Sequence, residues 1–196
     1  DPHPKIVPGL DKIIAEVISV NEGSIGFTRK KSVWADSKQQ KNFTFDKLNK
    51  VFNFTLDPCS THENAKCNKY YTKEDNGLSK DWSGEIVFCN PPYGNSISKW
   101  VEKCYKEGLK AVTVVMLIPS RTDTKWQHKY IFNNAKVICF IKGRLKFINR
   151  LLPSCKEDGN FNISSAPFPS QIVVFGNITN EQISVLESLG KVFINN

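Results

Sequence analysis

The sequence predicts an α/β domain in which a mostly parallel sheet is covered by helices on both faces. Continuously apolar segments such as AVTVVMLIP (111–119) and QIVVFG (171–176) have the composition of strands that are buried on both faces. Segments with apolar residues at helical spacing alternate with these strands, as in parallel sheets whose strands are joined by crossover helices. Ligands in such sheets bind at the carboxyl ends of the strands, so the residues that follow each strand are candidates for function.

The first expected element is an amphipathic helix over residues 10–20, because its apolar side chains recur at helical spacing. A polar, irregular segment follows up to residue 42, and FDKLNKVF (45–52) predicts a second short helix. Further strands are expected at 54–58, 69–72, 85–90, 111–119, 136–141, 143–149, 171–176 and in a short final KVFIN, with helices at 96–108, 122–134 and about 180–189. We therefore divide the chain into an N-terminal segment (1–42) and a main domain (43–196).

Composition and charge indicate a folded protein whose basic excess either favours an anionic partner or is simply a property of its surface. Of the 196 residues, 40% are hydrophobic and 23% are charged, which argues against extensive disorder. No apolar run reaches the ~18 residues that span a membrane, and the N-terminus lacks the basic-then-apolar layout of a signal peptide. The net charge of +8 favours an anionic partner, either nucleic acid or an anionic membrane surface.

The six cysteines show no disulfide framework, and several lie in apolar segments, so we expect reduced thiols in a cytoplasmic protein. The spacing of Cys59, His62 and Cys67 invites comparison with a zinc site. No fourth ligand follows at short spacing, and the chain has no CxxC motif. We therefore interpret these residues as buried thiols and a surface histidine, and we expect no metal.

Polar residues directly follow three of the expected strands. Asp57 ends the first of them, Asn90 follows the third, and Ser120 and Arg121 follow the central strand. Because the carboxyl ends of parallel strands meet at one edge of a sheet, we expect these side chains to lie close together. The stretch 150–168, rich in Pro, Gly, Ser and Asn, interrupts the alternation of elements and is a candidate recognition loop.

The segment Asn90-Pro91-Pro92-Tyr93 presents hydrogen-bond acceptors beside an aromatic ring. A residue before proline is extended, and the two prolines fix their own φ angles and donate no backbone N–H. The Asn90 side-chain oxygen and the Pro91 carbonyl remain as acceptors, and they suit a planar –NH2 group on a conjugated ring or carbonyl. Two acceptors that hold both hydrogens localise the nitrogen lone pair toward an electrophile, and the Tyr93 ring can stack on the planar group.

Basic residues occur in further places that we interpret as contacts to nucleic-acid phosphates. Lys142, Arg144 and Lys146 alternate and would share one face of a strand. Trp126, in the segment PSRTDTKWQH (119–128), either contacts a base or lies in the core. The phosphate-binding candidates are Arg29, Lys30, Lys31, Arg121, Lys125, Lys142, Arg144 and Lys146.

Several motifs together give the sequence a specific resemblance to a known family. They are FTLDPCS (54–60), EIVFCNPPYG (85–94), VVMLIPSRTDTKW (114–126), KGRLKF (142–147) and APFPSQIVVF (166–175). Over about residues 45–176, the chain resembles the phage-type DNA adenine-N6 methyltransferases. The resemblance implies a class I methyltransferase (Rossmann-like) fold and transfer of a methyl group from S-adenosylmethionine to N6 of an adenine flipped out of double-stranded DNA. It also suggests a role in phage self-protection from restriction, with a host or mobile-element role equally compatible. Because no apolar run is long enough to span a membrane, we expect no membrane partner.

The resemblance also assigns roles to individual residues. Asn90, Pro91, Pro92 and Tyr93 match the catalytic motif. The cofactor would be bound by Asp57, Pro58, Cys59 and Asn90, by Glu74 or Asp75 at its ribose, and by Asn76 at its adenine amine. The chain departs from the family at two points: Asn76 stands where a second Asp is usual, and the usual Thr-Pro is absent after Trp34.

Two alternatives stay open. The Asn-Pro-Pro-Tyr motif also serves methyltransferases that modify RNA guanine or protein glutamine, because each of these substrates is a conjugated –NH2 group. The departures at Asn76 and after Trp34 are compatible with a degenerate homologue that binds DNA or another partner without catalysis.

Overall fold

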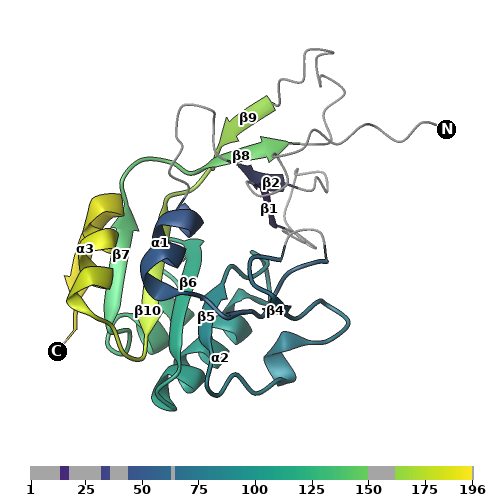
Figure 1. Cartoon of the computed structure of the whole chain (residues 1–196). Helices are drawn as coiled ribbons and strands as arrows, with labels where there is room; N and C mark the ends of the chain where they lie inside the picture. The colour runs from purple at the N-terminus through teal and green to yellow at the C-terminus, as the bar shows by residue number, and fades with distance from the viewer. Residues whose placement is uncertain (1–13, 18–31, 36–43, 63–64, 150–161, 196) are drawn as a thin grey trace.

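The computed structural model describes residues 14–17, 32–35, 44–62, 65–149 and 162–195, which form two β-sheets and a set of helices (Figure 1). The larger sheet has seven strands in the order β11-β7-β10-β6-β5-β3-β4. They are β3 (Leu56–Asp57), β4 (Lys69–Tyr70), β5 (Ile86–Cys89), β6 (Thr113–Pro119), β7 (Val137–Ile141), β10 (Ser170–Phe175) and β11 (Gly190–Ile194). The helices are α1 (Thr44–Phe52), the 3-10 helix η1 (Gly77–Ser79), α2 (Ile97–Leu109), the π-helix η2 (Gln127–Ile131) and α3 (Asn180–Leu189). These elements confirm the α/β prediction, most of them with shorter bounds, and η1 lies where no element is predicted.

The larger sheet is mixed, so the prediction of a mostly parallel sheet holds for only one part of it. From β4 through β3 and β5 to β6, all neighbours are parallel. In contrast, β10 runs antiparallel to both of its neighbours, β6 and β7, and β11 runs antiparallel to β7. In the described part of the connection from β7 to β10, the chain forms the strands β8 and β9 and no helix. The chain leaves β7 at its carboxyl end and re-enters the sheet from that same edge, whereas a parallel return needs a crossover connection.

Helices cover both faces of this sheet, as predicted. Successive residues of β6 point to opposite faces, and they fall into two separate apolar clusters. Met116 packs in the cluster that contains Trp100 of α2, and Leu117 packs in the cluster that contains Leu48 of α1 and Leu186 of α3. Full burial of a side chain such as Leu48 contributes about 1.5–3 kcal/mol to the free energy of unfolding. Figure 1 shows α1 and α3 on the face toward the viewer and α2 behind the sheet.

A second sheet of four antiparallel strands lies beyond the edge where β5, β6 and β7 end (Figure 1). Its order is β1-β2-β8-β9, with β1 (Ile14–Val17), β2 (Ser32–Ala35), β8 (Lys146–Asn149) and β9 (Asn162–Ser165). The helix predicted over 10–20 is therefore wrong for residues 14–17, where pairing with β2 and two β-branched residues favour a strand. The stretch 150–168, for which the sequence predicts a loop, contains a strand at 162–165 that pairs with β8.

Some of the predicted features lie outside the residues that the structure describes. Residues 10–13, 18–20 and 150–161 lie outside the described residues, and so do Arg29, Lys30 and Lys31. None of the helices in the described segments has the length and apolar character needed to cross a lipid bilayer.

Candidate active site

The parallel part of the sheet brings the predicted polar residues to one edge, as the order of strands requires. Asp57 ends β3, Asn90 follows β5 directly, and Ser120 follows β6. These three strands are neighbours in the sheet. The backbone N–H of Ser120 donates to the carbonyl of Pro169 at 2.8 Å, so the segment that enters β10 also lies at this edge.

Asn90 and Tyr93 are joined by a hydrogen bond within the predicted catalytic motif. The Tyr93 hydroxyl donates to Oδ1 of Asn90 at 2.9 Å, and it lies 3.3 Å from the Leu117 carbonyl. Tyr93 is 8% exposed, and burial raises the pKa of its hydroxyl well above the ordinary value, so the group stays neutral and can donate. A carbonyl-type oxygen has two lone pairs, so Oδ1 of Asn90 can accept a second hydrogen bond.

An aromatic residue that no sequence argument singles out packs beside the motif. Phe168 meets the Tyr93 ring edge-on, with 5.6 Å between ring centroids and 82° between ring planes. It belongs to the connection between β9 and β10, which the Ser120–Pro169 hydrogen bond holds at the sheet edge. The Ala-Pro-Phe-Pro sequence could have indicated a fixed position for Phe168, because prolines on both sides of an aromatic residue restrict its backbone.

Asp57 is a buried carboxylate at the end of β3. Its Oδ1 accepts from the Cys59 N–H at 3.3 Å, and its Oδ2 accepts from the Lys66 N–H at 3.1 Å. Burial raises the pKa of Asp57 from 3.8 to about 6, against the lowering effect of these two backbone bonds. At neutral pH the carboxylate is therefore mostly ionised in a place where its charge is poorly solvated, and a cationic ligand would stabilise it.

The residues that follow Asp57 form a loop against the end of β4. The Ser60 N–H donates to the Tyr71 carbonyl at 3.0 Å, and the Tyr71 N–H donates to the Asp57 carbonyl at 2.9 Å. The Ser60 hydroxyl is buried and has no hydrogen-bond partner among the described residues, so it is available to a ligand. The Cys59 sulfur lies 3.8 Å from that of Cys89, and burial raises the pKa of both thiols, so they remain protonated. Cys89 is buried, as expected, whereas Cys59 is half-buried.

The turn that contains the candidate ribose and adenine contacts is exposed. Oδ2 of Asp75 accepts hydrogen bonds from both the backbone N–H and the hydroxyl of Thr72, each at 2.8 Å, and these bonds lower the pKa of Asp75. Asp75 therefore shapes the turn, while Glu74 is exposed beside it. Asn76 has φ 54°, and Gly77 packs so closely against Pro58 that an added Cβ would lie 2.0 Å from the Pro58 carbonyl oxygen. The structure thus brings the turn next to the Asp57-Pro58 loop.

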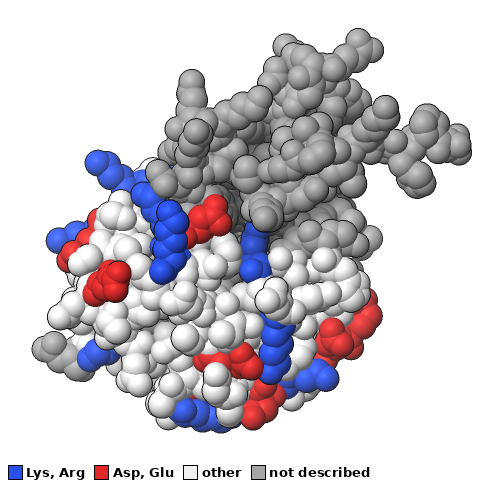
Figure 2. All heavy atoms as spheres, in the orientation of Figure 1, with Lys and Arg blue, Asp and Glu red and all other residues white. Residues whose placement is uncertain are grey.

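The structure confirms only part of what the sequence predicts for the candidate phosphate-binding residues. Arg121, Lys125, Lys142 and Arg144 are exposed, and a guanidinium nitrogen of Arg144 donates to the Ala166 carbonyl at 3.3 Å. The prediction that Lys142, Arg144 and Lys146 share one strand face is wrong, because the chain bends at Gly143 (φ 83°) and β8 begins only at Lys146. On the face shown in Figure 2, basic and acidic side chains are interspersed.

Burial and contacts also describe Trp126 and His62. Trp126 is 8% exposed and belongs to the core cluster around α2, so the core interpretation of this residue is confirmed. The His62 ring lies 2.9 Å from the Tyr70 hydroxyl through Nδ1. Across the described segments, no group of three or more His, Cys, Asp or Glu side chains could hold a metal ion.

Comparison with known proteins gives a consistent assignment. Residues 15–188 match the family model described as DNA N-6-adenine-methyltransferase (Dam). The chain is 33% identical over 96 residues to a DNA N-6-adenine-methyltransferase of Haemophilus phage HP1, which covers 49% of this chain and 56% of that protein. It is 30% identical over 86 residues to a protein of the same description from Escherichia phage T1, which covers 43% of this chain and 36% of that protein. The chain thus spans about half the length, or less, of these curated relatives.

Proposed function

The chain belongs to the DNA N-6-adenine-methyltransferase family, and we propose that it transfers a methyl group from S-adenosylmethionine to N6 of an adenine flipped out of double-stranded DNA at a specific site. The observation that supports this proposal best is the position of Asn90. Asn90 follows the carboxyl end of β5, next to the strand β3 that ends at Asp57, and its side-chain oxygen is oriented by the Tyr93 hydroxyl.

Asn90 and Pro91 would bind the amino group that reacts. The free lone pair of Asn90 Oδ1 and the Pro91 carbonyl accept the two N6 hydrogens of adenine, and this directs the nitrogen lone pair toward the methyl donor. The proton can leave after transfer, so no strong general base is required. Tyr93 and Phe168 supply aromatic surface for the base beside these acceptors, and base–aromatic stacking contributes about 1–3 kcal/mol.

The residues at the ends of β3 and β4 fit S-adenosylmethionine. Bound there, the cofactor would supply an electrophilic methyl group on a positively charged sulfur. The buried Asp57 carboxylate favours a cationic ligand, and the unpartnered Ser60 hydroxyl offers a hydrogen bond. Glu74 and Asn76, exposed on the neighbouring turn, are the candidates for the ribose hydroxyls and the adenine amine. Asn76 can accept from that amine through its side-chain oxygen, although it lacks the charge of the usual Asp.

Exposed basic residues near the same edge would hold DNA. Arg121 lies just after β6, and Lys142 and Arg144 lie between β7 and the second sheet. Each phosphate that such a residue neutralises releases counterions, so the affinity for DNA would decrease steeply with salt. We assign the same role to Lys125, Lys146, Arg29, Lys30 and Lys31, and we assign sequence recognition to residues in 150–168.

The test is a map of methylated bases in DNA from cells that express the wild-type protein or Asn90→Ala. We expect site-specific N6-methyladenine with the wild type and almost none with Asn90→Ala. Asn177→Ala is the matched control, because Asn177 is exposed and follows β10 at the opposite edge of the sheet. Equal methylation by the wild type and Asn90→Ala would overturn the catalytic role of Asn90, and methylated products other than N6-methyladenine would overturn the substrate.

A further inference from the structure

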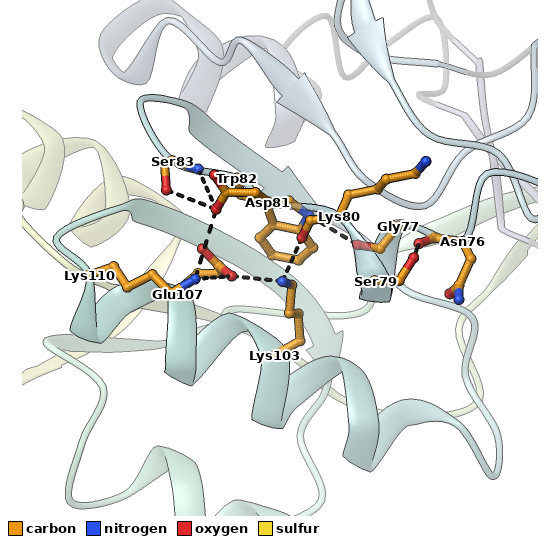
Figure 3. A network of polar contacts seen from close by, with 10 residues as sticks. All are labelled: Asn76, Gly77, Ser79, Lys80, Asp81, Trp82, Ser83, Lys103, Glu107 and Lys110. Carbon is orange, nitrogen blue, oxygen red and sulfur yellow. Dashed lines mark hydrogen bonds and ion pairs between the residues drawn. The ribbon is translucent and has the colours of Figure 1, made fainter.

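A buried carboxylate on α2 has no role in the chemistry proposed above. Glu107 is 1% exposed, and its Oε1 accepts from Nζ of Lys103 at 2.7 Å and from Nζ of Lys110 at 3.1 Å (Figure 3). Its other oxygen, Oε2, has no hydrogen-bond partner among the described residues. An ion pair at such a place is weak evidence for stability, because apolar residues of similar size often serve as well. The pair therefore calls for another explanation.

Lys103 connects this carboxylate to a different part of the chain. Its Nζ also donates to the backbone carbonyl of Lys80 at 2.6 Å and lies 5.0 Å from the centroid of the Trp82 ring. Lys110 makes a longer contact with Asp81, at 3.8 Å. In Figure 3 the Lys103 side chain rises from α2 to the segment that carries Lys80 and Trp82. Glu107 holds the lysine amine in place, and the lysine binds the loop.

From this loop, hydrogen bonds continue to the turn that carries the candidate cofactor contacts. The Lys80 N–H and the Trp82 ring N–H both donate to the Gly77 carbonyl, at 3.3 Å and 3.1 Å. The Ser79 hydroxyl donates to the Asn76 carbonyl at 2.8 Å. Gly77 in turn packs against the Pro58 carbonyl and the Trp100 ring of α2. The position of Asn76 relative to the Asp57-Pro58 loop thus depends on contacts anchored on α2.

We propose that Lys103, held by Glu107, is a positioning residue that fixes the 76–82 loop for binding of the adenosine part of the cofactor. This inference rests on the proposed function, because it takes Glu74 and Asn76 as the adenosine contacts. Without the Lys103–Lys80 bond, only a fraction of the molecules would hold the turn in the conformation that binds the cofactor. If the competent fraction falls to one-tenth, the apparent Kd rises about tenfold. The substitution does not alter the reacting groups at Asn90, so we expect it to lower cofactor affinity and to leave kcat unchanged.

The chain offers a matched control on the same helix. Lys106 and Glu102 form an ion pair with the same i,i+4 spacing at 2.8 Å, but their side chains are 62% and 39% exposed. The test is calorimetry of the wild type, Lys103→Met and Lys106→Met with S-adenosylhomocysteine, together with KM for S-adenosylmethionine, kcat and the Kd for DNA. We expect a Kd and KM about tenfold higher for Lys103→Met, with kcat at saturating cofactor and DNA affinity unchanged, and wild-type values for Lys106→Met.

A second variant separates positioning from folding. Lys103→Met combined with Glu107→Leu removes the buried charge and fills its place with apolar atoms, so it should fold even if Lys103→Met does not. It still lacks the bond to Lys80, so we expect the same loss of affinity. Wild-type cofactor affinity in this folded double variant would overturn the inference and leave the proposed function intact. Equal losses of cofactor and DNA affinity would also overturn it. If the wild-type protein itself bound no cofactor, the proposed function would fail first.

Discussion

The hydroxyl of Tyr93 donates a hydrogen bond to the side-chain oxygen of Asn90 at 2.9 Å, so two residues of the proposed catalytic motif orient each other before any substrate is bound. This bond uses one lone pair of Asn90 Oδ1 and fixes the direction of the other. Tyr93 thus has two roles in the proposed reaction: its ring provides aromatic surface, and its hydroxyl sets the orientation of the acceptor.

Tyr93→Phe separates these two roles, because it keeps the ring and removes the hydroxyl. A net hydrogen bond is worth about 0.5–1.5 kcal/mol, so we expect kcat to decrease by about two- to thirteenfold, with little change in cofactor affinity. Single-turnover methylation of a DNA duplex measures the effect. Tyr105→Phe is the control, because its ring packs on Phe175 within the same cluster. Unchanged kcat in Tyr93→Phe would show that the hydroxyl does not orient Asn90 during the reaction.

Asp57 should make the stability of the protein depend on pH in an unusual direction. Its pKa is about 6 in the folded protein, against an ordinary value of 3.8. Between these values the folded state retains a proton that the unfolded state has lost, so the free energy of unfolding falls as the pH rises. Relative to Asp57→Asn, the wild type should lose up to about 3 kcal/mol between about pH 4 and pH 6.

Urea unfolding of the wild type and Asp57→Asn at a series of pH values measures this difference. Other carboxylates titrate in the same range, but their contributions are common to both proteins and cancel in the comparison. Stability curves that stay parallel over this range would contradict the raised pKa of Asp57.

A reciprocal amide pair supports the segment that carries Arg121. Gln127 of η2 and Gln171 of β10 are both fully buried, and each donates its amide to the other, at 3.3 Å and 2.7 Å. Gln171→Leu leaves the Gln127 amide buried without its partner and should lower the free energy of unfolding by about 1–3 kcal/mol. The double Leu variant should lose less than the sum of the two single variants. Urea unfolding of the wild type, Gln127→Leu, Gln171→Leu and the double variant gives the double-mutant cycle. Strictly additive losses of the free energy of unfolding would show that the pair is not coupled.

The sequence predicts the location of the site better than its internal contacts. Asp57 and Asn90 could be placed at one edge because each follows an apolar strand, and strand order then brings them together. The bond from Tyr93 to Asn90 depends on the orientation of the buried Tyr93 side chain, whose hydroxyl also lies 3.3 Å from the Leu117 carbonyl, and no spacing encodes this orientation. The helical spacing places Glu107 on the same face of α2 as the buried residues Trp100, Val101 and Cys104. A charged residue on an apolar helix face was therefore the sequence feature that could have identified it.

The errors in the predicted fold have a common source. Apolar runs identify strands, but they do not give strand direction. The hydrophobic pattern of β10 would be the same for a strand parallel to β6 as for the antiparallel strand in the structure. The sequence predicts no helix between the strands at 143–149 and 171–176, and this was the available sign of a reversal. The second sheet joins segments that are far apart in sequence, β2 with β8, so local spacing could not predict its pairing.

Arg121 provides the sharpest test of the proposed DNA-binding edge. It is exposed and directly follows Ser120 at the carboxyl end of β6, so a phosphate contact there should add counterion release. We expect Arg121→Gln to reduce the slope of log K against log salt for a DNA duplex by about 0.9, and to weaken binding to specific and nonspecific duplexes alike. Lys191→Gln is the control, because Lys191 is exposed on the edge strand β11, at the other end of the sheet order from β4. Fluorescence anisotropy at several salt concentrations measures both slopes. An unchanged slope in Arg121→Gln, or an equal change in Lys191→Gln, would place the DNA elsewhere on the protein.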